Sequence, residues 1–471
     1  MPNNFAYLML IIWPFVSIWL YKKYDIIPAT FWTIVGGHLF LPIGVEFDFP
    51  LVPVLDKRTI PTIIAYVGCK YISKKPMTLL PPAGLERNLM LLLFLGAIGT
   101  VLSNHDPIIE VGRYLPGLGY HDIFSVIMAQ FILLLPFTLA LQIIKTPDDQ
   151  IKLLKLLVAA GLIYSGFIIF ELRMSPQLHK WVYGYFPYMW GQHERYGGFR
   201  PVVFLGHGLW VSIFIVTVLS SALTLSKVKI KLTKQPNFIV LGYLFLLLLF
   251  AKGFGATLLG MVVFVSITFL SVQLNNRLAL IITLVAVTYP LLCVLNVFPH
   301  DYLIENIQLI DSAQAGSLQF RFGHEAALLD RALEKIVFGW GAWGRNRLPD
   351  SVVDGYWISV IGMYGTVGFV AIFGLMLSGV LRASIVFKNL TETRDKVLMT
   401  GHAILVSVLV LDQIPNHSEN PLFWFLIGSL AGRHYYTISL SKKEAISIPV
   451  NSISSDERSL HSTGSGKGTV S

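Results

Sequence analysis

Two basic side chains lie where a long apolar run begins or ends, a third lies in a polar stretch between two such runs, and their types favour anion binding. Arg200 lies in RYGGFRPVVFLGHG, Lys252 in LLLLFAKGFGATLLG and Arg321 in SLQFRFGHEAALLDRALEK. A guanidinium group is a planar fork that matches phosphate oxygens, whereas an ammonium group acts as a point charge. Ionisable groups within apolar sequence are by default candidates for function. The chemistry that these residues favour is therefore recognition of a phosphate or a related anion.

Each of these cations also has a structural alternative. Pro201 fits the first turn of a helix, so Arg200 would lie just before a helix start, where arginine often snorkels to lipid headgroups. Lys252 could snorkel in the same way from a tight turn. Arg321 could pair with Glu325 four residues later, which contributes a few tenths of a kcal/mol.

The polar stretch Ser317–Gly344 predicts an amphipathic helix followed by a glycine-rich turn. Ser317 is the expected N-cap of this helix. His324 is a candidate general base, and its alternative is a solvated or stacking side chain. The glycine turn would let the chain double back toward Asp354. One helical face would then carry Arg321, His324, Glu325 and Leu328.

Further polar and aromatic residues lie near the same segments. Asp354 is either a base or orienting carboxylate, or only a favourable charge at a helix start. Asp412, His417 and Glu419 lie in a polar turn, LDQIPNHSENP, that could line the same vestibule or merely connect two spans. His207 is expected about two turns inside a helix as a packed histidine. Aromatic residues, Trp190 among them, crowd residues 181–199, where they could stack on sugars or form an interfacial belt.

The composition requires a membrane to position these residues. The chain has 471 residues, of which 54% are hydrophobic and 13% charged, whereas a soluble protein carries roughly 25% charged residues. The net charge of +9 is dispersed, which argues against nucleic-acid binding. Cys69 and Cys293 lie in apolar runs and are interpreted as small buried hydrophobes. The sequence contains no HExxH, CxxC or Walker motif, so no metal site and no cofactor are predicted.

We predict an all-α polytopic membrane protein with about 12–13 transmembrane helices and a large extracytoplasmic loop that contains an amphipathic helix, because a span needs about 20 apolar residues. The second and third candidates are short and interrupted by proline and glycine. The thirteen candidates are residues 5–21, 28–45, 59–75, 86–103, 121–144, 153–172, 202–224, 237–251, 255–273, 278–297, 355–378, 397–414 and 421–438.

Loop charge predicts the orientation, because cytoplasmic loops are enriched in lysine and arginine. In the thirteen-span scheme, the basic clusters fall on one side, which is then the cytoplasmic side. The N-terminus would be outside and the C-terminus inside. The clusters begin at Lys22, Lys70, Lys145, Lys227, Arg382 and Lys442.

The same scheme divides the chain into four parts. Residues 1–297 form an N-terminal transmembrane bundle of spans one to ten, and residues 298–354 form the extracytoplasmic catalytic loop. Residues 355–440 contain the last three spans. The tail, 441–471, is rich in serine, glycine and lysine and is predicted to be disordered.

Four segments, in this order and spacing, resemble the O-antigen ligase and O-antigen polymerase superfamily of integral membrane glycosyltransferases. GGFRPVVFLGHGLW is similar to an arginine segment that enters a span, and AKGFGATLLG to a span-connecting turn. SLQFRFGHEAALLDRALEKIVFGWGAWG is similar to the periplasmic arginine, helix and G-x-G turn, and DGYWISVIGMYGTVGFV to the span that follows. The resemblance covers roughly residues 195–430.

The resemblance implies a glycosyltransferase that uses an undecaprenyl-diphosphate-linked glycan at the outer face of a bacterial inner membrane. Arg200 and Arg321 would hold the diphosphate, and Lys252 would stand where the family often has arginine. Arg195, His207, Trp190 and Trp343 complete the expected substrate-binding set. Besides the bilayer, other membrane proteins of polysaccharide assembly are expected partners.

The position of the base separates two activities. Ligases of this family usually begin the span after the loop with His-Asn, where this chain has Asp354 and Gly355. We therefore expect a polymerase of exopolysaccharide or O-antigen repeat units in which Asp354, or His324, is the base. The alternatives are a ligase that transfers the finished glycan to a lipid or protein, and a transporter or flippase of the lipid-linked glycan.

Overall fold

The protein is almost entirely helical. The computed structural model describes residues 1–49, 53–110, 112–195, 197–309 and 311–447, and 71% of these residues are helical. Its α-helices are α1 (Asn4–Lys23), α2 (Ile26–Phe31), α3 (Gly37–Phe40), α4 (Thr59–Val67), α5 (Leu85–Leu102), α6 (Tyr120–Ile143), α7 (Pro147–Met174), α8 (Leu178–Tyr183), α9 (Gly208–Lys227), α10 (Asn237–Phe250), α11 (Phe254–Phe269), α12 (Val272–Val294), α13 (His300–Gln308), α14 (Ser312–Glu334), α15 (Tyr356–Asn389), α16 (Thr393–Asp412) and α17 (Pro421–Ser447).

Short elements complete the chain. η1 (Trp32–Gly36) and η2 (Gly68–Ile72) are π-helical, and η3 (Trp190–His193) is a 3-10 helix. Two antiparallel hairpins pair β1 (Ile108–Glu110) with β2 (Arg113–Leu115) and β3 (Glu194–Arg195) with β4 (Gly198–Phe199). All four strands are too short to form a sheet with a core of its own.

The chain is a polytopic α-helical membrane protein, which confirms the predicted fold class. Within the described residues, seven helices are long and apolar enough to cross a membrane: α1, α5, α6, α7, α9, α12 and α15. Three shorter apolar helical segments, Ile26–Phe40, Asn237–Phe250 and Phe254–Phe269, add to these.

The second and third predicted spans are broken into short pieces. Residues 28–45 form α2, η1 and α3, and residues 59–75 form α4 and η2. Glycines at the breaks allow close packing: a Cβ on Gly37 would lie 2.5 Å from the ring of Pro61, and one on Gly68 would lie 2.2 Å from the ring of Tyr21. The glycines that interrupt these two predicted spans therefore lie where neighbouring helical segments pack against each other.

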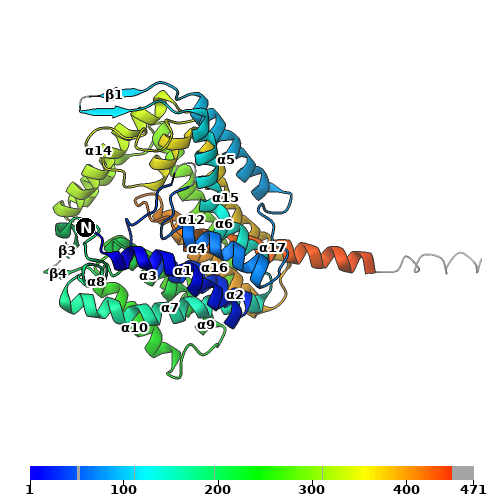
Figure 1. Ribbon diagram of the computed structural model, residues 1–471. Helices are drawn as coiled ribbons and strands as arrows, with labels where there is room; N and C mark the ends of the chain where they lie inside the picture. The colour runs from blue at the N-terminus through cyan, green and yellow to red at the C-terminus, as the bar shows by residue number, and fades with distance from the viewer. Residues whose placement is uncertain (50–52, 111, 196, 310, 448–471) are drawn as a thin grey trace, which may run out of the picture.

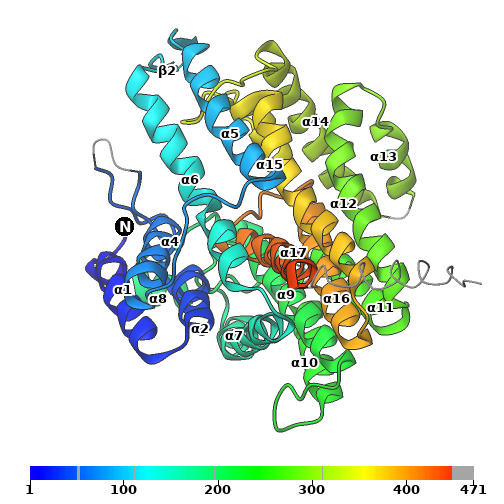
Figure 2. The same ribbon diagram turned by 90° about the vertical axis from the view of Figure 1, so that its right-hand side faces the viewer.

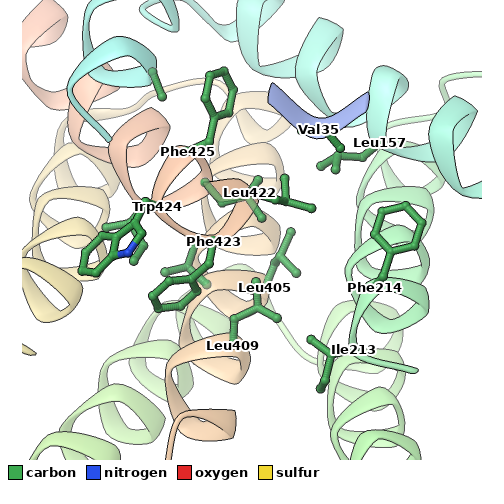
Figure 3. Close-up of a cluster of buried hydrophobic side chains, with 14 of the residues drawn as sticks. Val35, Leu157, Ile213, Phe214, Leu405, Leu409, Leu422, Phe423, Trp424 and Phe425 are labelled. Carbon is green, nitrogen blue, oxygen red and sulfur yellow. The ribbon is translucent and has the colours of Figure 1, made fainter. Parts of the chain in front are cut away.

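The centre of the bundle is apolar and is built mainly by α9, α16 and α17 (Figure 3). Phe214 of α9, Leu405 of α16 and Phe425 of α17 are all buried in it. Helix α17 approaches α6 closely because Gly428 and Gly432 face it. A Cβ on Gly428 would lie 2.1 Å from the carbonyl oxygen of Phe137. Small residues spaced by four let two membrane helices pack with their backbones in contact.

Helix α15 is broken at Gly365, which has φ 64° and ψ −163°. The break frees backbone N–H groups that the preceding loop satisfies. Thr366 N–H donates to the carbonyl of Ile336 at 2.7 Å, and Val367 N–H to that of Val337 at 3.2 Å. In return, Trp340 N–H donates to the carbonyl of Gly362 at 2.8 Å. The glycine-rich turn after α14 is thus held against the middle of α15.

The hairpins and loop helices lie on one side of the molecule. Figure 1 shows β1, α14, α8 and the β3–β4 hairpin toward the same side as the N-terminus, whereas α17 ends at the opposite side. Figure 2 shows α13 and α14 beside the end of α12. At the other side, Glu86 is fully buried and accepts hydrogen bonds from Arg382 at 2.8 and 3.2 Å. We refer to the hairpin-bearing side as the loop face.

The tail prediction is wrong at its start. Helix α17 continues to Ser447, so residues 441–447 are helical. The remainder of that prediction, residues 448–471, lies outside the described residues.

Candidate functional site

Residues 200–207 form a non-helical strap with a turn at Val203–Leu205, not the start of a helix. Helix α9 begins only at Gly208, with His207 as its N-cap, whose Nδ1 accepts from Leu209 N–H at 3.1 Å. The predictions that Pro201 opens the helix and that His207 lies two turns inside it are therefore wrong. Glu171 of α7 explains the difference, because its Oε2 accepts from Val202 N–H and Val203 N–H at 2.7 Å each.

The strap buries Arg200. Its side chain is 4% exposed, and its backbone N–H donates to the carbonyl of His193 at 2.8 Å. The prediction that Arg200 directly precedes a helix and faces an open vestibule is wrong, because α9 begins eight residues later and Arg200 is buried. The Cβ that Gly208 lacks would lie 3.2 Å from Nε of Arg200, so the guanidinium group lies across the first turn of α9. A helix N-terminus is itself a favourable place for an anion.

Burial and nearby cations keep two histidines beside Arg200 neutral. The rings of His193 and His207 lie 5.2 Å apart. Burial, followed by the charges of Arg200 and Arg195, lowers the pKa of His193 to about 4. Burial and the charge of Arg200 lower the pKa of His207 to about 3, with smaller contributions from other cations that include Arg321. The histidines are therefore neutral, and the arginines carry the charge.

The β3–β4 hairpin brings two more predicted residues to this place. Lys252, in the turn between α10 and α11, donates from Nζ to the carbonyl of Arg195 at 2.9 Å. It has a left-handed backbone, with φ 55°, as a tight turn requires. Trp190 donates to Glu194 at 3.1 Å and has its ring 6.0 Å from that of Phe199. Arg195, Arg200, His207, Lys252 and Trp190 are thus brought together.

Helix α14 supplies a second group of predicted residues. It begins at Ser312, so the prediction that Ser317 is its N-cap is wrong. Arg321 Nε lies 3.5 Å from Oδ2 of Asp354, and Arg321 Nη1 donates to the carbonyl of Pro415 at 3.1 Å. The alternative pair with Glu325 is replaced by this contact. Both charged side chains stay about one-third exposed, which leaves them open to a ligand.

Asp354 does not cap α15. That helix begins at Tyr356 with Gly355 as its N-cap. His324 packs its ring 4.4 Å from Phe320 and accepts a long hydrogen bond of 3.5 Å from Val352 N–H, which matches the stacking alternative better than a base poised for catalysis. Asp354 is therefore the better placed candidate for a base, since its carboxylate is about one-third exposed and lies beside Arg321, another predicted site residue.

The polar turn 413–420 links these two groups. Trp210 of α9 donates to the carbonyl of His417 at 3.3 Å, and Arg321 contacts Pro415 in the same turn. Asp412, which is buried, anchors the turn by accepting from Ser418 and Asn416 at 2.5 and 2.8 Å. The turn therefore connects the strap of Arg200 with the helix of Arg321.

Beyond the turn lies a cavity of about 410 Å³. Its charged residues are Arg58 and three acids, Glu419, Asp48 and Asp56, and the side chains of Arg58 and Glu419 approach to 3.5 Å. Apolar side chains of α6, such as Ile132 and Leu133, form another wall. Trp343, 53% exposed, also lines it, so this predicted residue belongs to the cavity and not to the Arg200 group.

Sequence reasoning missed Arg58 and its neighbour Lys57. Lys57 is 4% exposed and donates to the carbonyl of Phe204 at 2.9 Å, so it holds the strap. A signal was available: in the thirteen-span scheme these two cations fall on the non-cytoplasmic side, against the rule that governs the other basic clusters. Cations that break this rule are candidates for function.

The arrangement can bind an anion at the loop face. Arg200 is buried and preorganised, Arg321 is half-open and paired with a carboxylate, and Arg58 lies at the cavity. Fixed cations in a partly desolvated site stabilise developing negative charge better than mobile ones in water. Family models, curated proteins and solved structures were compared with the chain, and none matches.

Proposed function

We propose that the protein polymerises oligosaccharide repeat units carried on a polyprenyl diphosphate, at the outer face of the bacterial inner membrane. The observation that carries the proposal is the placement of Arg321, with Asp354 beside it, against the turn 413–420, which also contacts α9, the helix whose first turn lies beside Arg200. The expected resemblance to the O-antigen ligase and polymerase superfamily rests on sequence segments alone.

The cavity supports a lipid-linked substrate. It combines an apolar wall on α6, a membrane-crossing helix, with the charged pair of Arg58 and Glu419. An amphiphile needs both surfaces, since its chain must leave water and its headgroup must not. Trp343 adds an aromatic face of the kind on which sugar rings stack.

The reaction would be a single displacement that uses no metal. A hydroxyl oxygen of the acceptor sugar forms a bond to the anomeric carbon of the donor, and the bond from that carbon to the phosphate oxygen breaks. The electron pair leaves with the lipid diphosphate, where Arg200 and Arg321 stabilise the charge. Asp354 accepts the proton of the hydroxyl. Direct displacement inverts the anomeric centre.

Substitution of the two arginines tests the proposal. We expect Arg200→Ala and Arg321→Ala each to lower polymer formation by about 100-fold or more, as for loss of one fixed donor to a developing anion. Arg200→Lys keeps the charge without the fork and should recover activity only partly. Asp354→Asn should also reduce polymer if the carboxylate is the base. Polymer is measured by gel electrophoresis of membrane glycans, at matched protein levels.

The control is Arg173→Ala, an exposed arginine at the end of α7. Long polymer in both Arg200→Ala and Arg321→Ala would contradict the proposed mechanism. A deletion strain separates the alternatives: single repeat units on the carrier indicate a polymerase, and long chains on the carrier indicate a ligase. Accumulation of repeat units on the inner leaflet would instead indicate a flippase.

A further inference from the structure

Three potential metal ligands converge at the end of α12 on the loop face. Cys293 lies near the end of α12, His300 begins α13 and Glu325 lies in α14. Nε2 of His300 lies 3.9 Å from Sγ of Cys293 and 4.0 Å from Oε1 of Glu325. The three ligand atoms all lie within 4.8 Å of one another. Three consecutive helices thus meet at one point.

These separations are close to those of a zinc site. Zn²⁺ binds thiolate sulfur at about 2.3 Å and imidazole nitrogen or carboxylate oxygen at about 2.0–2.2 Å. In a tetrahedral site, two such ligands are therefore about 3.5 Å apart. Shifts of about half an ångström in the two separations from His300, and of about 1 Å or slightly more between Cys293 and Glu325, would bring these side chains to that geometry. One sulfur, one nitrogen and one oxygen ligand suit a borderline cation better than Mg²⁺ or Ca²⁺, which prefer oxygen alone.

The surroundings resemble the outer shell of a metal site. Cys293 is 7% exposed, and the side chain of Glu325 is 15% exposed. Tyr289 and Trp357 fix the Glu325 carboxylate, since they donate to Oε1 at 2.6 Å and to Oε2 at 3.1 Å. Groups that orient a ligand in this way raise metal affinity.

Aromatic rings enclose the cluster and limit water access. The ring of His300 lies 4.8 Å from that of Phe298 and 4.5 Å from that of Phe322. The ring of Tyr289 lies 4.7 Å from that of Phe298. An apolar shell of this kind strengthens the attraction between a cation and its charged ligands.

We propose that Cys293, His300 and Glu325 bind a Zn²⁺ ion. The thiol and the carboxyl group release their protons when they bind the cation, and imidazole binds through Nε2. The remaining tetrahedral position is open to a water molecule. Sequence analysis had interpreted Cys293 only as a buried hydrophobe, because the spacing of the three ligands matches no metal motif.

The ion would tie α12, α13 and α14 together. Because α14 carries Arg321, the site would fix the loop helix against the membrane bundle. The inference does not rest on the proposed glycosyl transfer, since the three ligands are separate from Arg200, Arg321 and Asp354. Failure of either proposal therefore leaves the other standing.

Metal binding by the whole chain in detergent tests the inference. Chelator-treated protein is dialysed against Zn²⁺ and its metal content measured by mass spectrometry; we expect a single ion per chain. Co²⁺ is then used as a spectroscopic probe of the wild-type protein. A thiolate-to-cobalt charge-transfer band is expected, because the thiolate of Cys293 is the only sulfur ligand in the proposed set.

Variants assign the ligands. Cys293→Ser should remove the charge-transfer band and the bound zinc, whereas Cys69→Ser, at the other buried cysteine, should keep both. Trp357→Phe removes the hydrogen bond to Glu325 and should weaken Zn²⁺ binding by about 10-fold or more. Wild-type protein that binds no zinc, or that binds Co²⁺ without the band, overturns the inference. So does a Cys69→Ser variant that alone loses the metal.

Discussion

Lys57, which holds the strap, is buried, and its burial makes the stability of the folded protein depend on pH. Burial, assisted by the neighbouring charge of Arg58, lowers the pKa of Lys57 from 10.5 to about 7. Between these two values the unfolded chain binds a proton that the folded protein does not. The free energy of unfolding therefore rises with pH between about 7 and 10.5. Below pH 7, where Lys57 is protonated in both states, this group adds no pH dependence.

We predict that the thermal midpoint of the wild-type protein rises between pH 7 and pH 10, and that Lys57→Met removes most of this slope. Scanning fluorimetry at several pH values in one detergent measures the thermal midpoint and its slope with pH. Lys229→Met, at an exposed lysine in the turn after α9, is the matched control and should keep the wild-type slope. A slope of equal size in Lys57→Met would show that another group is responsible.

At the scale of single residues, the sequence predicted which residue types are candidates for the site, but not which of them contact each other. Arg321 and Asp354 were both selected as site candidates, and the structure pairs them at 3.5 Å. Arg58 was missed because its importance comes from Glu419, some 360 residues away, which meets it only in the folded chain. No local pattern records such a pair.

At the scale of elements, long apolar helices were predictable and the strap was not. Helices such as α5 and α6 follow directly from apolar runs of spanning length. Residues 201–207 are as apolar as a helix start, yet Glu171 takes their N–H groups and Lys57 takes the carbonyl of Phe204. A distant carboxylate therefore decides a local conformation that hydropathy assigns to a helix.

The kink in α15 is the element-scale feature most sensitive to substitution. Gly365 has a left-handed φ of 64°, and a Cβ there would lie 2.2 Å from the carbonyl oxygen of Val337. We predict that Gly365→Ala destabilises the protein by at least about 1–2 kcal/mol through backbone strain alone. Gly242→Ala, where a Cβ meets nothing within 4 Å, should leave stability nearly unchanged.

The midpoints of thermal or denaturant unfolding of Gly365→Ala and Gly242→Ala test this predicted difference in stability. If Gly365→Ala also loosens the loop that α15 holds, proteolysis should cut the segment after α14 faster than in the wild-type protein. Equal midpoints for Gly365→Ala and wild type would mean that α15 can straighten without cost, and that the loop does not depend on the kink.

At the scale of the whole molecule, a basic segment lies on one side, and the candidate site and the hairpins lie on the other. Arg382 contacts His434 and Asp395 pairs with Arg433, both in the middle of α17, so the basic segment around residues 382–396 lies beside this helix. The candidate site and both hairpins lie on the opposite side (Figure 1). Because basic loops remain in the cytoplasm, this arrangement predicts that the loop face is extracytoplasmic.

Cysteine labelling in intact cells tests the orientation. Both native cysteines are buried, so background labelling should be low. Ile109, 76% exposed at the tip of β1, and Lys229, exposed in the turn after α9, are replaced by cysteine one at a time. A membrane-impermeant maleimide should label Ile109→Cys in intact cells and Lys229→Cys only after lysis. The reverse pattern would place the arginine cluster in the cytoplasm, where a glycan displayed outside could not reach it, and would overturn the proposed polymerase together with the orientation.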